Sequence, residues 1–163
     1  MPKEEEKINV LFVCLGNICR SPLAEAVFID IITKAGLRER FGKIDSCGTG
    51  NYHEGEEPDE RSVALCRRKG IPIDSLARGV VPQDFRDFDY ILGMDVNNVR
   101  NLKNMQPRSS RAVIKLFGEF DDNQPIADPY YGGRNGFELA YEQIVRYSHG
   151  FLRSLGLGQA AQL

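Results

Sequence analysis

The sequence predicts a single α/β domain in which helices cover both faces of a four-stranded parallel, doubly wound sheet. Three observations predict it. Residues 8–13 (Ile-Asn-Val-Leu-Phe-Val) form a short, nearly apolar run, which is typical of a central parallel strand buried on both faces. A polar loop and a helical pattern follow at once, and this order then repeats along the chain. The 163 residues are enough for one domain with a substantial core.

The first helix is predicted to follow the loop at residues 14–20. Ser21 is a favourable N-cap, Pro22 suits the first helical position, and apolar residues then recur at helical spacing until Gly36. The remaining strands are expected at 43–47, 90–94 and 112–117, and the remaining helices at 58–69, 96–103 and 137–152. Residues 118–136 are expected to form a long loop rich in Asp, Pro and Gly. We therefore expect a domain at 8–156, between a flexible tail at 1–7 and a C-terminal tail at 157–163.

Composition and charge exclude several classes of protein. Hydrophobic residues make up 42% and charged residues 27%, which are ordinary globular values. The formal net charge of −2 gives no general attraction for nucleic acid or an anionic membrane. No run approaches the roughly 20 apolar residues that span a bilayer, and the charged start of the chain is unlike a secretory signal. We expect a cytoplasmic protein that binds neither nucleic acid nor a membrane.

The cysteines and histidines do not form a metal-binding pattern. The four cysteines include no C-x-x-C pair, and the two histidines, His53 and His149, lie far apart in the sequence. A disulfide scaffold is not expected in a chain of this size. Cys47 and Cys66 are expected to be small buried residues, His53 a solvated loop residue and His149 a structural one. We therefore expect no metal ion and no cofactor.

The loop between the first strand and the first helix carries the strongest chemical signal. Cys14 and Arg20 are separated by five residues, and Ser21 follows. Backbone N–H groups at the start of a helix can surround an anion, and the helix dipole favours negative charge there. An arginine at this spacing can place its guanidinium on two phosphate oxygens. The same positive environment favours the thiolate of Cys14, which is a nucleophile toward a bound phosphorus atom. The loop lacks the G-x-x-x-x-G-K-[ST] pattern of nucleotide-hydrolysing proteins.

A second chemical group is expected at the same edge of the sheet. In sheets of this kind, ligands bind beyond the carboxyl ends of the strands. Cys14 ends the first strand and the 118–136 loop follows the fourth, so both open onto this edge. Within that loop, Asp128 precedes a proline, which favours an extended backbone on an open loop. A carboxylate on this loop would lie at the same edge as Cys14, although an Asp-Pro pair by itself is also typical of an ordinary turn.

The segment from Val13 to Pro22, Val-Cys-Leu-Gly-Asn-Ile-Cys-Arg-Ser-Pro, resembles the signature loop of the low-molecular-weight protein tyrosine phosphatases almost letter for letter. The likeness continues through Asp45–Ser46, Asp89–Leu92, Met94–Asp95 and Asp128–Gly132, and it covers nearly the whole chain. The resemblance implies a flavodoxin-like fold of the phosphotyrosine phosphatase I type. It also implies a cysteine-dependent hydrolase of protein phosphotyrosine and small aryl phosphates, with acid phosphatase activity and inorganic phosphate as a product.

The resemblance further implies a role for each matching residue. Cys14 would be the nucleophile that forms a phosphocysteine, Arg20 would hold the phosphoryl group, and Asp128 would be the general acid and then the general base. The substrate-binding residues would be Leu15, Gly16, Asn17, Ile18, Cys19, Ser21, Tyr52, Tyr130 and Tyr131. Ser21 would also donate a hydrogen bond to the Cys14 thiolate, and the loop would be supported by Asn17, Ser46 and Asp95. A monomer without a cofactor is expected.

Two positions carry further expectations. Cys19 lies close to Cys14 in the loop, and the two could form a disulfide after peroxide oxidation and so prevent over-oxidation. The second position is a departure from the family pattern. Many relatives carry a histidine near Ser75, in a Ser-His-x-Ala-Arg stretch that supports the phosphate loop, whereas residues 74–78 here read Asp-Ser-Leu-Ala-Arg.

Two other functions are compatible with a Cys-x5-Arg loop in this fold. A thioredoxin-coupled arsenate reductase shares the fold and a Cys-x5-Arg loop, but it needs two further cysteines on a mobile segment after the second helix. Residues 70–92 contain no cysteine. A catalytically silent phosphate-binding module would need neither Cys14 nor Asp128. Because both residues are present, the sequence favours the phosphatase.

Overall fold

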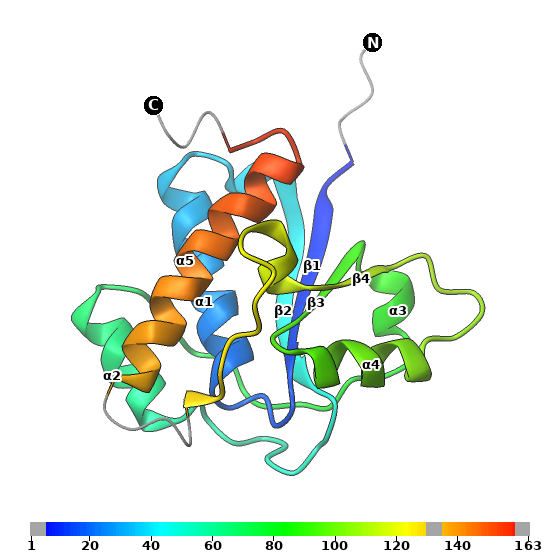
Figure 1. The fold of residues 1–163 in the computed structure, drawn as a ribbon, viewed down its shortest axis with the longest axis horizontal. Coiled ribbons are helices and arrows are strands. Elements are labelled where there is room, and N and C mark those ends of the chain that lie inside the picture. Colours follow the sequence, from blue (N-terminus) through cyan, green and yellow to red (C-terminus); the bar gives the residue numbers. More distant parts are fainter. Residues whose placement is uncertain (1–5, 130–134, 159–163) are drawn as a thin grey trace.

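The computed structural model describes residues 6–129 and 135–158. Its centre is a four-stranded sheet in the order β2-β1-β3-β4, in which all neighbouring strands pair in parallel (Figure 1). The strands are β1 (Ile8–Cys14), β2 (Phe41–Gly48), β3 (Tyr90–Gly93) and β4 (Val113–Leu116). The predicted parallel α/β fold is therefore confirmed. The second strand begins earlier than the sequence pattern suggested.

Helices cover both faces of the sheet, as predicted. One face carries α1 (Arg20–Lys34), α2 (Glu60–Arg68) and α5 (Gly136–Ser154), and the other carries α3 (Asp84–Asp87) and α4 (Val96–Met105) (Figure 1). Two 3-10 helices, η1 (Arg38–Arg40) and η2 (Phe117–Phe120), complete the elements. The sequence did not predict α3 or the 3-10 helices, because helical periodicity cannot be recognised in three or four residues. Among the described residues, no helix is long and apolar enough to cross a membrane.

Strand β1 is the centre of the core. Its residues Val10 to Val13 have no exposed surface, because neighbouring strands and helices enclose them on every side. Successive side chains point to opposite faces, so Phe12 packs beneath α1 and α5 while Leu11 packs beneath α3 and α4. The apolar run that predicted a central strand thus fills both halves of the core.

The order of the strands determines where the functional loops meet. The chain leaves β1 to form β2 on one side and later returns to form β3 on the other side. The loop after β1 therefore lies at the switch point, where a parallel sheet opens a crevice. Because all four strands run the same way, the segments after β1, β2, β3 and β4 begin at this one edge.

The start of α1 differs from the prediction. The helix begins at Arg20, with Cys19 at the N-cap position and no side-chain capping bond. Ser21 is inside the helix and fully buried, so its expected role as N-cap was wrong. Its hydroxyl instead contacts the sulfur of Cys14, as described below.

Candidate active site

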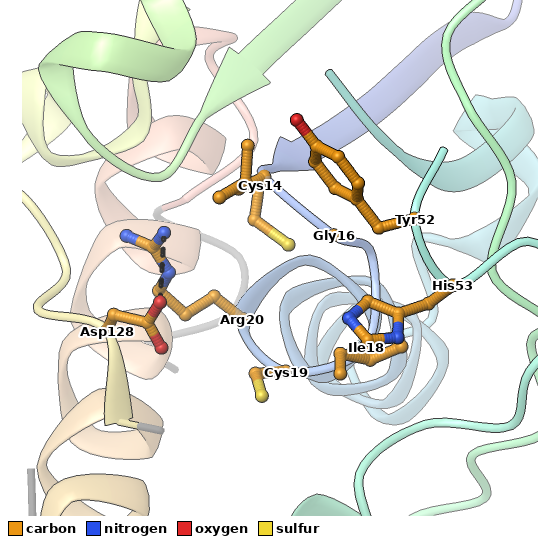
Figure 2. Close-up of a pocket in the computed structure, with 9 residues that line it drawn as sticks. Cys14, Gly16, Ile18, Cys19, Arg20, Tyr52, His53 and Asp128 are labelled. Carbon is orange, nitrogen blue, oxygen red and sulfur yellow. Dashed lines mark ion pairs between the residues drawn. The ribbon is translucent and has the colours of Figure 1, made fainter. Parts of the chain in front are cut away.

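A cavity of about 230 Å³ lies at the carboxyl edge of the sheet. It is lined by Cys14, Leu15, Gly16, Ile18, Cys19, Arg20, Tyr52, His53 and Asp128. Figure 2 shows Arg20 and Asp128 on one side of this cavity and Tyr52 and His53 on the other, with Cys14 between them. The structure therefore brings together the three residues that the sequence singled out for chemistry, although Asp128 is more than a hundred positions away along the chain.

Cys14 ends β1 with its sulfur inside the loop that follows. The backbone N–H of Asn17 donates to Cys14 Sγ at 3.2 Å, and the Ser21 hydroxyl lies 3.0 Å from the same sulfur. The Ser21 oxygen also accepts a hydrogen bond from the side-chain amide of Asn17 at 2.8 Å. The serine proton is thus free to point at Cys14, since the alternative acceptor, the carbonyl of Cys47, lies farther away at 3.4 Å. Two donors are in place to stabilise a thiolate.

Asn17 holds the shape of the loop. Its backbone adopts a left-handed conformation with φ of 59°, which asparagine tolerates better than most residues. Its side chain is buried and uses both ends: the amide donates to Ser21, and the oxygen accepts from the backbone N–H of Arg78 at 3.0 Å. The phosphate loop is therefore tied to the segment that precedes α3.

Arg20 is oriented by groups from two other segments. Its Nη1 donates to Asp95 and to the carbonyl of Ile126, both at 2.8 Å. Asp95 is itself fixed, because it caps α4 by accepting from the backbone N–H of Asn98. Arg20 is only 4% exposed, and an arginine this buried requires such partners.

Asp128 reaches the cavity from the loop after β4. One of its oxygens lies 3.8 Å from Nη2 of Arg20. The loop is anchored nearby, since the backbone N–H of Ile126 donates to the carbonyl of Met94 at 2.9 Å. This anchor and the Arg20 bond to Ile126 together bring the carboxylate to the site, and the side chain of Asp128 keeps about a third of its surface exposed.

Cys19 lies in the same cavity as Cys14 but in a different electrostatic environment. Its thiol donates a weak hydrogen bond to Asp59 at 3.9 Å. Burial, with a further contribution from the negative charge of Asp59, raises the pKa of Cys19 to about 12. Asp59 also donates its backbone N–H to the carbonyl of Ile18, so the start of α2 supports this part of the loop.

Some predicted site residues are placed differently or lie outside the described ranges. Ser46 is buried, and its hydroxyl donates to Glu25 of α1 at 2.6 Å. This bond holds β2 to α1 and does not reach a residue of the loop at 14–20. Tyr52 lines the cavity with 75% of its surface exposed. Tyr130 and Tyr131 lie outside the described residues.

The sequence also missed residues that belong to the site. His53, expected to be a solvated loop residue, lines the cavity beside Gly16 and pairs through Nδ1 with Glu56. Its position directly after Tyr52 was the available signal. Ile126 contributes through its backbone carbonyl, which leaves no residue-type signal in a sequence. Arg78 contacts Asn17 through its backbone N–H, and only the family stretch at residues 74–78 pointed to its segment. Across residues 6–129 and 135–158, no group of His, Cys, Asp and Glu is arranged to hold a metal ion.

Comparisons with known proteins agree with this geometry. A family model described as low molecular weight phosphotyrosine protein phosphatase matches residues 9–160. The chain belongs to this family. A Schizosaccharomyces pombe relative of the same description is 50% identical over 153 residues, covering 92% of this chain and 98% of the relative. The Homo sapiens relative is 44% identical over 153 residues, covering 91% and 96%. The chain is thus a phosphatase, and the family favours this function over the arsenate reductase and the silent module.

Solved structures of related phosphatases share the fold. A crystal structure of a protein tyrosine phosphatase from Entamoeba histolytica, with Hepes in its active site, superimposes with a TM-score of 0.86 at 37% identity, covering 94% of this chain and 99% of that one. The structure of DARP, described as a drosophila arginine phosphatase, gives a TM-score of 0.84 at 35% identity, covering 91% and 98%. Phosphatases with this fold are therefore described for two different phosphorylated residues, tyrosine and arginine.

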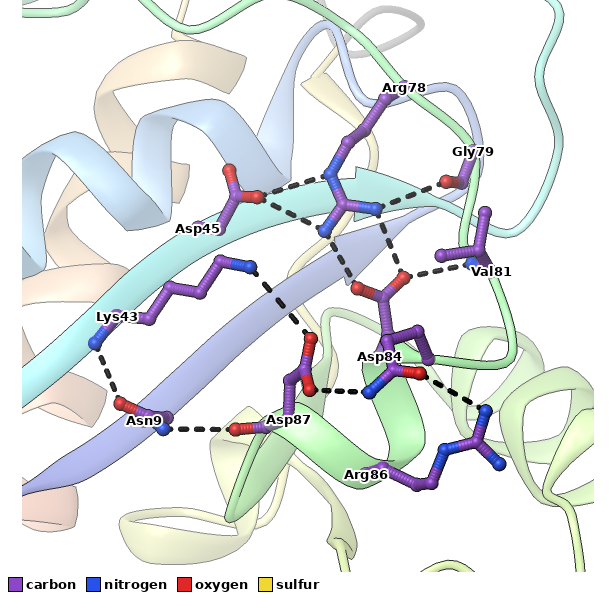
Figure 3. A network of polar contacts seen from close by, with 10 residues as sticks. Asn9, Lys43, Asp45, Arg78, Gly79, Val81, Asp84, Arg86 and Asp87 are labelled. Carbon is purple, nitrogen blue, oxygen red and sulfur yellow. Dashed lines mark hydrogen bonds and ion pairs between the residues drawn. The ribbon is translucent and has the colours of Figure 1, made fainter.

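Arg78 connects the loop at residues 14–20 to two carboxylates outside the active site (Figure 3). The guanidinium makes two hydrogen bonds of 3.0 Å to Asp84, which is 3% exposed, and one of 3.1 Å to Asp45. The backbone of Arg78 at the same time donates to Asn17 and accepts from Gly48. The ion pairs therefore fix the backbone of Arg78, whose N–H donates to the side-chain oxygen of Asn17.

The first prediction concerns this ion pair. Arg78→Met leaves the buried carboxylate of Asp84 without its bidentate partner, so we expect the free energy of unfolding to fall by roughly 3 kcal/mol. We also expect phosphatase kcat to fall, because the segment that holds Asn17 loses its anchor. Denaturant titration and p-nitrophenyl phosphate hydrolysis measure the two effects. The double variant Arg78→Met/Asp84→Leu should recover part of the stability, because it removes the unpaired carboxylate but also the acceptor of the Val81 N–H. A single variant as stable as the wild type would contradict the role of the pair.

Glu25 of α1 is the carboxylate that accepts the hydrogen bond from Ser46. It lines a second cavity, of about 220 Å³, together with Asp74 and Ser75. Burial raises the pKa of Glu25 to about 7, against the opposing effect of the hydrogen bond from Ser46. The negative charges of Asp45 and Asp74 also raise this pKa, whereas the positive charge of Arg78 lowers it.

The second prediction follows from the sign of this shift. Between its ordinary pKa of about 4.5 and the folded value of about 7, Glu25 keeps a proton in the folded state that the unfolded chain has released. The free energy of unfolding should therefore fall as the pH rises through this window, by up to about 1.4 kcal/mol per pH unit. Glu25→Gln retains an acceptor for Ser46 but cannot titrate. Its stability curve should be flatter than that of the wild type from pH 4.5 to 7, and parallel curves would exclude the effect.

Proposed function

We propose that the chain hydrolyses phosphotyrosine in proteins and small aryl phosphates through a phosphocysteine on Cys14. The observation that carries this proposal is that Asp128, on the loop after β4, lines the same cavity as Cys14 and Arg20, which border the loop after β1. Family membership supports a phosphatase, and the geometry supports the roles of the individual residues.

In the first step, the Cys14 thiolate attacks the phosphorus atom, and the bond from phosphorus to the phenolic oxygen breaks. Asp128 donates its proton to the leaving oxygen, so that the alcohol departs as a neutral phenol. Arg20 and the loop amides from Leu15 onward hold the oxygens of the phosphoryl group while charge moves among them. Ser21 and Asn17 keep the sulfur in its attacking position.

In the second step, water replaces the sulfur. The Asp128 carboxylate takes a proton from a water molecule, and the resulting nucleophile attacks the phosphorus atom of the phosphocysteine. The sulfur–phosphorus bond breaks, inorganic phosphate leaves, and the Cys14 thiolate is restored. The Ser21 hydroxyl is placed to stabilise this thiolate as leaving group. Asp95 keeps the Arg20 guanidinium in the same position through both steps.

The walls of the cavity support an aryl substrate. Leu15, Ile18 and Tyr52 present apolar and aromatic surface around the sulfur, which suits the faces of a phenyl ring. Tyr130 and Tyr131 are proposed to add to this wall. A phenol is also a better leaving group than a serine hydroxyl, because its pKa of about 10 is far lower. We further propose that this phosphatase is a monomer and that it works in the reducing cytoplasm. The four free, buried cysteines are consistent with the reducing compartment.

The third prediction tests the catalytic roles. With p-nitrophenyl phosphate, Cys14→Ser should show no detectable turnover, because an alcohol held in this loop is a far weaker nucleophile than a thiolate. Asp128→Ala should lower kcat by about 10²–10⁴, the usual contribution of a general acid.

The same assay should compare phosphotyrosine with N-phosphoarginine, because one structural neighbour is described as an arginine phosphatase. We expect the enzyme to prefer phosphotyrosine. Full activity of Cys14→Ser, or a preference for phosphoarginine, would contradict the proposal.

We also propose that Cys19 protects Cys14 from irreversible oxidation. Peroxide would oxidise the Cys14 thiolate to a sulfenic acid, and the Cys19 sulfur would then displace water to form a disulfide. The two residues line the same cavity, which supports the pairing. The high pKa of Cys19 keeps most of it a thiol, so it does not compete as a nucleophile toward substrate. Its attack on the sulfenic acid would proceed through the small thiolate fraction, so the disulfide would form slowly.

The fourth prediction concerns recovery from peroxide. The wild-type enzyme should regain most of its activity with dithiothreitol after inactivation. Cys19→Ser should regain much less, because its Cys14 continues to the sulfinic acid. Residual activity after matched peroxide exposures measures the difference, with Cys66→Ser as a control buried cysteine. Equal recovery of Cys19→Ser and wild type would remove this role.

A further inference from the structure

A second groove adjoins the catalytic cavity. It has a volume of about 240 Å³ and is lined by Leu15, Thr49, Gly50, Tyr52, Asn101, Asn104 and Met105. Two of these residues, Leu15 and Tyr52, also line the catalytic cavity, so the two hollows lie on either side of this pair. None of the groove residues carries a charge.

The groove is built on a well-connected backbone. Its floor is joined to the phosphate loop, because the N–H of Thr49 donates to the carbonyl of Cys14 and the N–H of Gly50 to that of Leu15, both at 3.0 Å. Its far wall is the last part of α4, where Asn101, Asn104 and Met105 share one face at helical spacing. The groove is therefore formed without any rearrangement of the loop.

The surface of the groove suits an apolar side chain next to a polar backbone. Leu15 is 50%, Tyr52 75% and Met105 44% exposed, so these three large apolar residues gather around one hollow. The amides of Asn101 and Asn104 each offer donors and an acceptor, which is what the N–H and C=O groups of an extended peptide require. The hydroxyl of Thr49 is buried and has no hydrogen-bond partner among the described residues.

We propose that this groove is a subsite for a residue one or two positions from the phosphotyrosine of a protein substrate, and that it selects an uncharged, apolar side chain. The proposal rests on the proposed function. An extended chain advances by about 3.3–3.6 Å per residue, so a peptide whose phosphotyrosine enters the catalytic cavity places its nearest neighbours across Leu15 and Tyr52. An acidic side chain would lose water in the groove without gaining a cation, which makes it unfavourable there.

The test compares a small substrate with phosphotyrosine peptides. The peptides carry alanine at the two positions on each side of phosphotyrosine, with leucine or aspartate then placed at one position at a time. The groove variants are Met105→Glu and the isosteric Asn101→Asp, each of which adds a negative charge at an exposed site. Leu139→Glu is the matched control, because Leu139 is 58% exposed on α5 and lines neither hollow. For every enzyme, kcat/KM is measured for each peptide and for p-nitrophenyl phosphate.

We expect leucine at one flanking position to raise kcat/KM of the wild type by about 3- to 10-fold over alanine, and aspartate there to lower it. Both groove variants should lose this preference, while Leu139→Glu keeps it and all four enzymes hydrolyse p-nitrophenyl phosphate alike. If the groove variants discriminate among the peptides as the wild type does, the subsite is overturned and the proposed function stands. If the wild type hydrolyses p-nitrophenyl phosphate but none of the peptides, the proposed protein substrate fails, and the subsite fails with it.

Discussion

The left-handed backbone of Asn17 is the constraint on which the active site depends. It turns the chain after β1 so that the amide of Asn17 faces the Cys14 sulfur instead of continuing away from the strand. The side chain of the same residue then fixes Ser21 on one side and the backbone of Arg78 on the other. One buried asparagine thus sets both the donors around the sulfur and the position of the loop on the domain. Replacement by alanine would remove both hydrogen bonds of the side chain and place a less tolerant residue in the left-handed conformation, whereas glycine would remove the bonds without straining the turn.

The remaining supports act on either flank of that turn. The start of α2 holds the carbonyl of Ile18 through Asp59, and the Arg78 ion pairs hold the segment that contacts Asn17. Arg20 is positioned by a different contact. One oxygen of Asp95 caps α4, and the other accepts a hydrogen bond from the Arg20 guanidinium. A rigid loop matters for phosphoryl transfer, since the donors must already point at the oxygens whose charge changes.

The sequence predicted structure best where a pattern of residues is compatible with only one environment. The apolar run of β1 can be satisfied only by burial on both faces. Cys14 and Arg20 could be singled out because their spacing fits the chemistry of a phosphate ester, whereas the role of Asp128 came from the family resemblance. Ser21 shows the limit of this reasoning. A serine before a proline at the start of a helix fits an N-cap equally well, and only the backbone path of the loop turns its hydroxyl toward Cys14. Ser46 could not be placed either, because its partner Glu25 lies on another element.

The central claim is that the Cys14 sulfur becomes covalently bonded to phosphorus during turnover. It is tested most directly by mixing the enzyme with p-nitrophenyl phosphate, stopping the reaction within one turnover by rapid denaturation, and locating phosphate by mass spectrometry of proteolytic peptides. The account predicts an S-phosphate on Cys14 that disappears once substrate is exhausted. Phosphate on any other residue, or none on Cys14 in an enzyme that Asp128→Asn has slowed at the hydrolysis step, would contradict it.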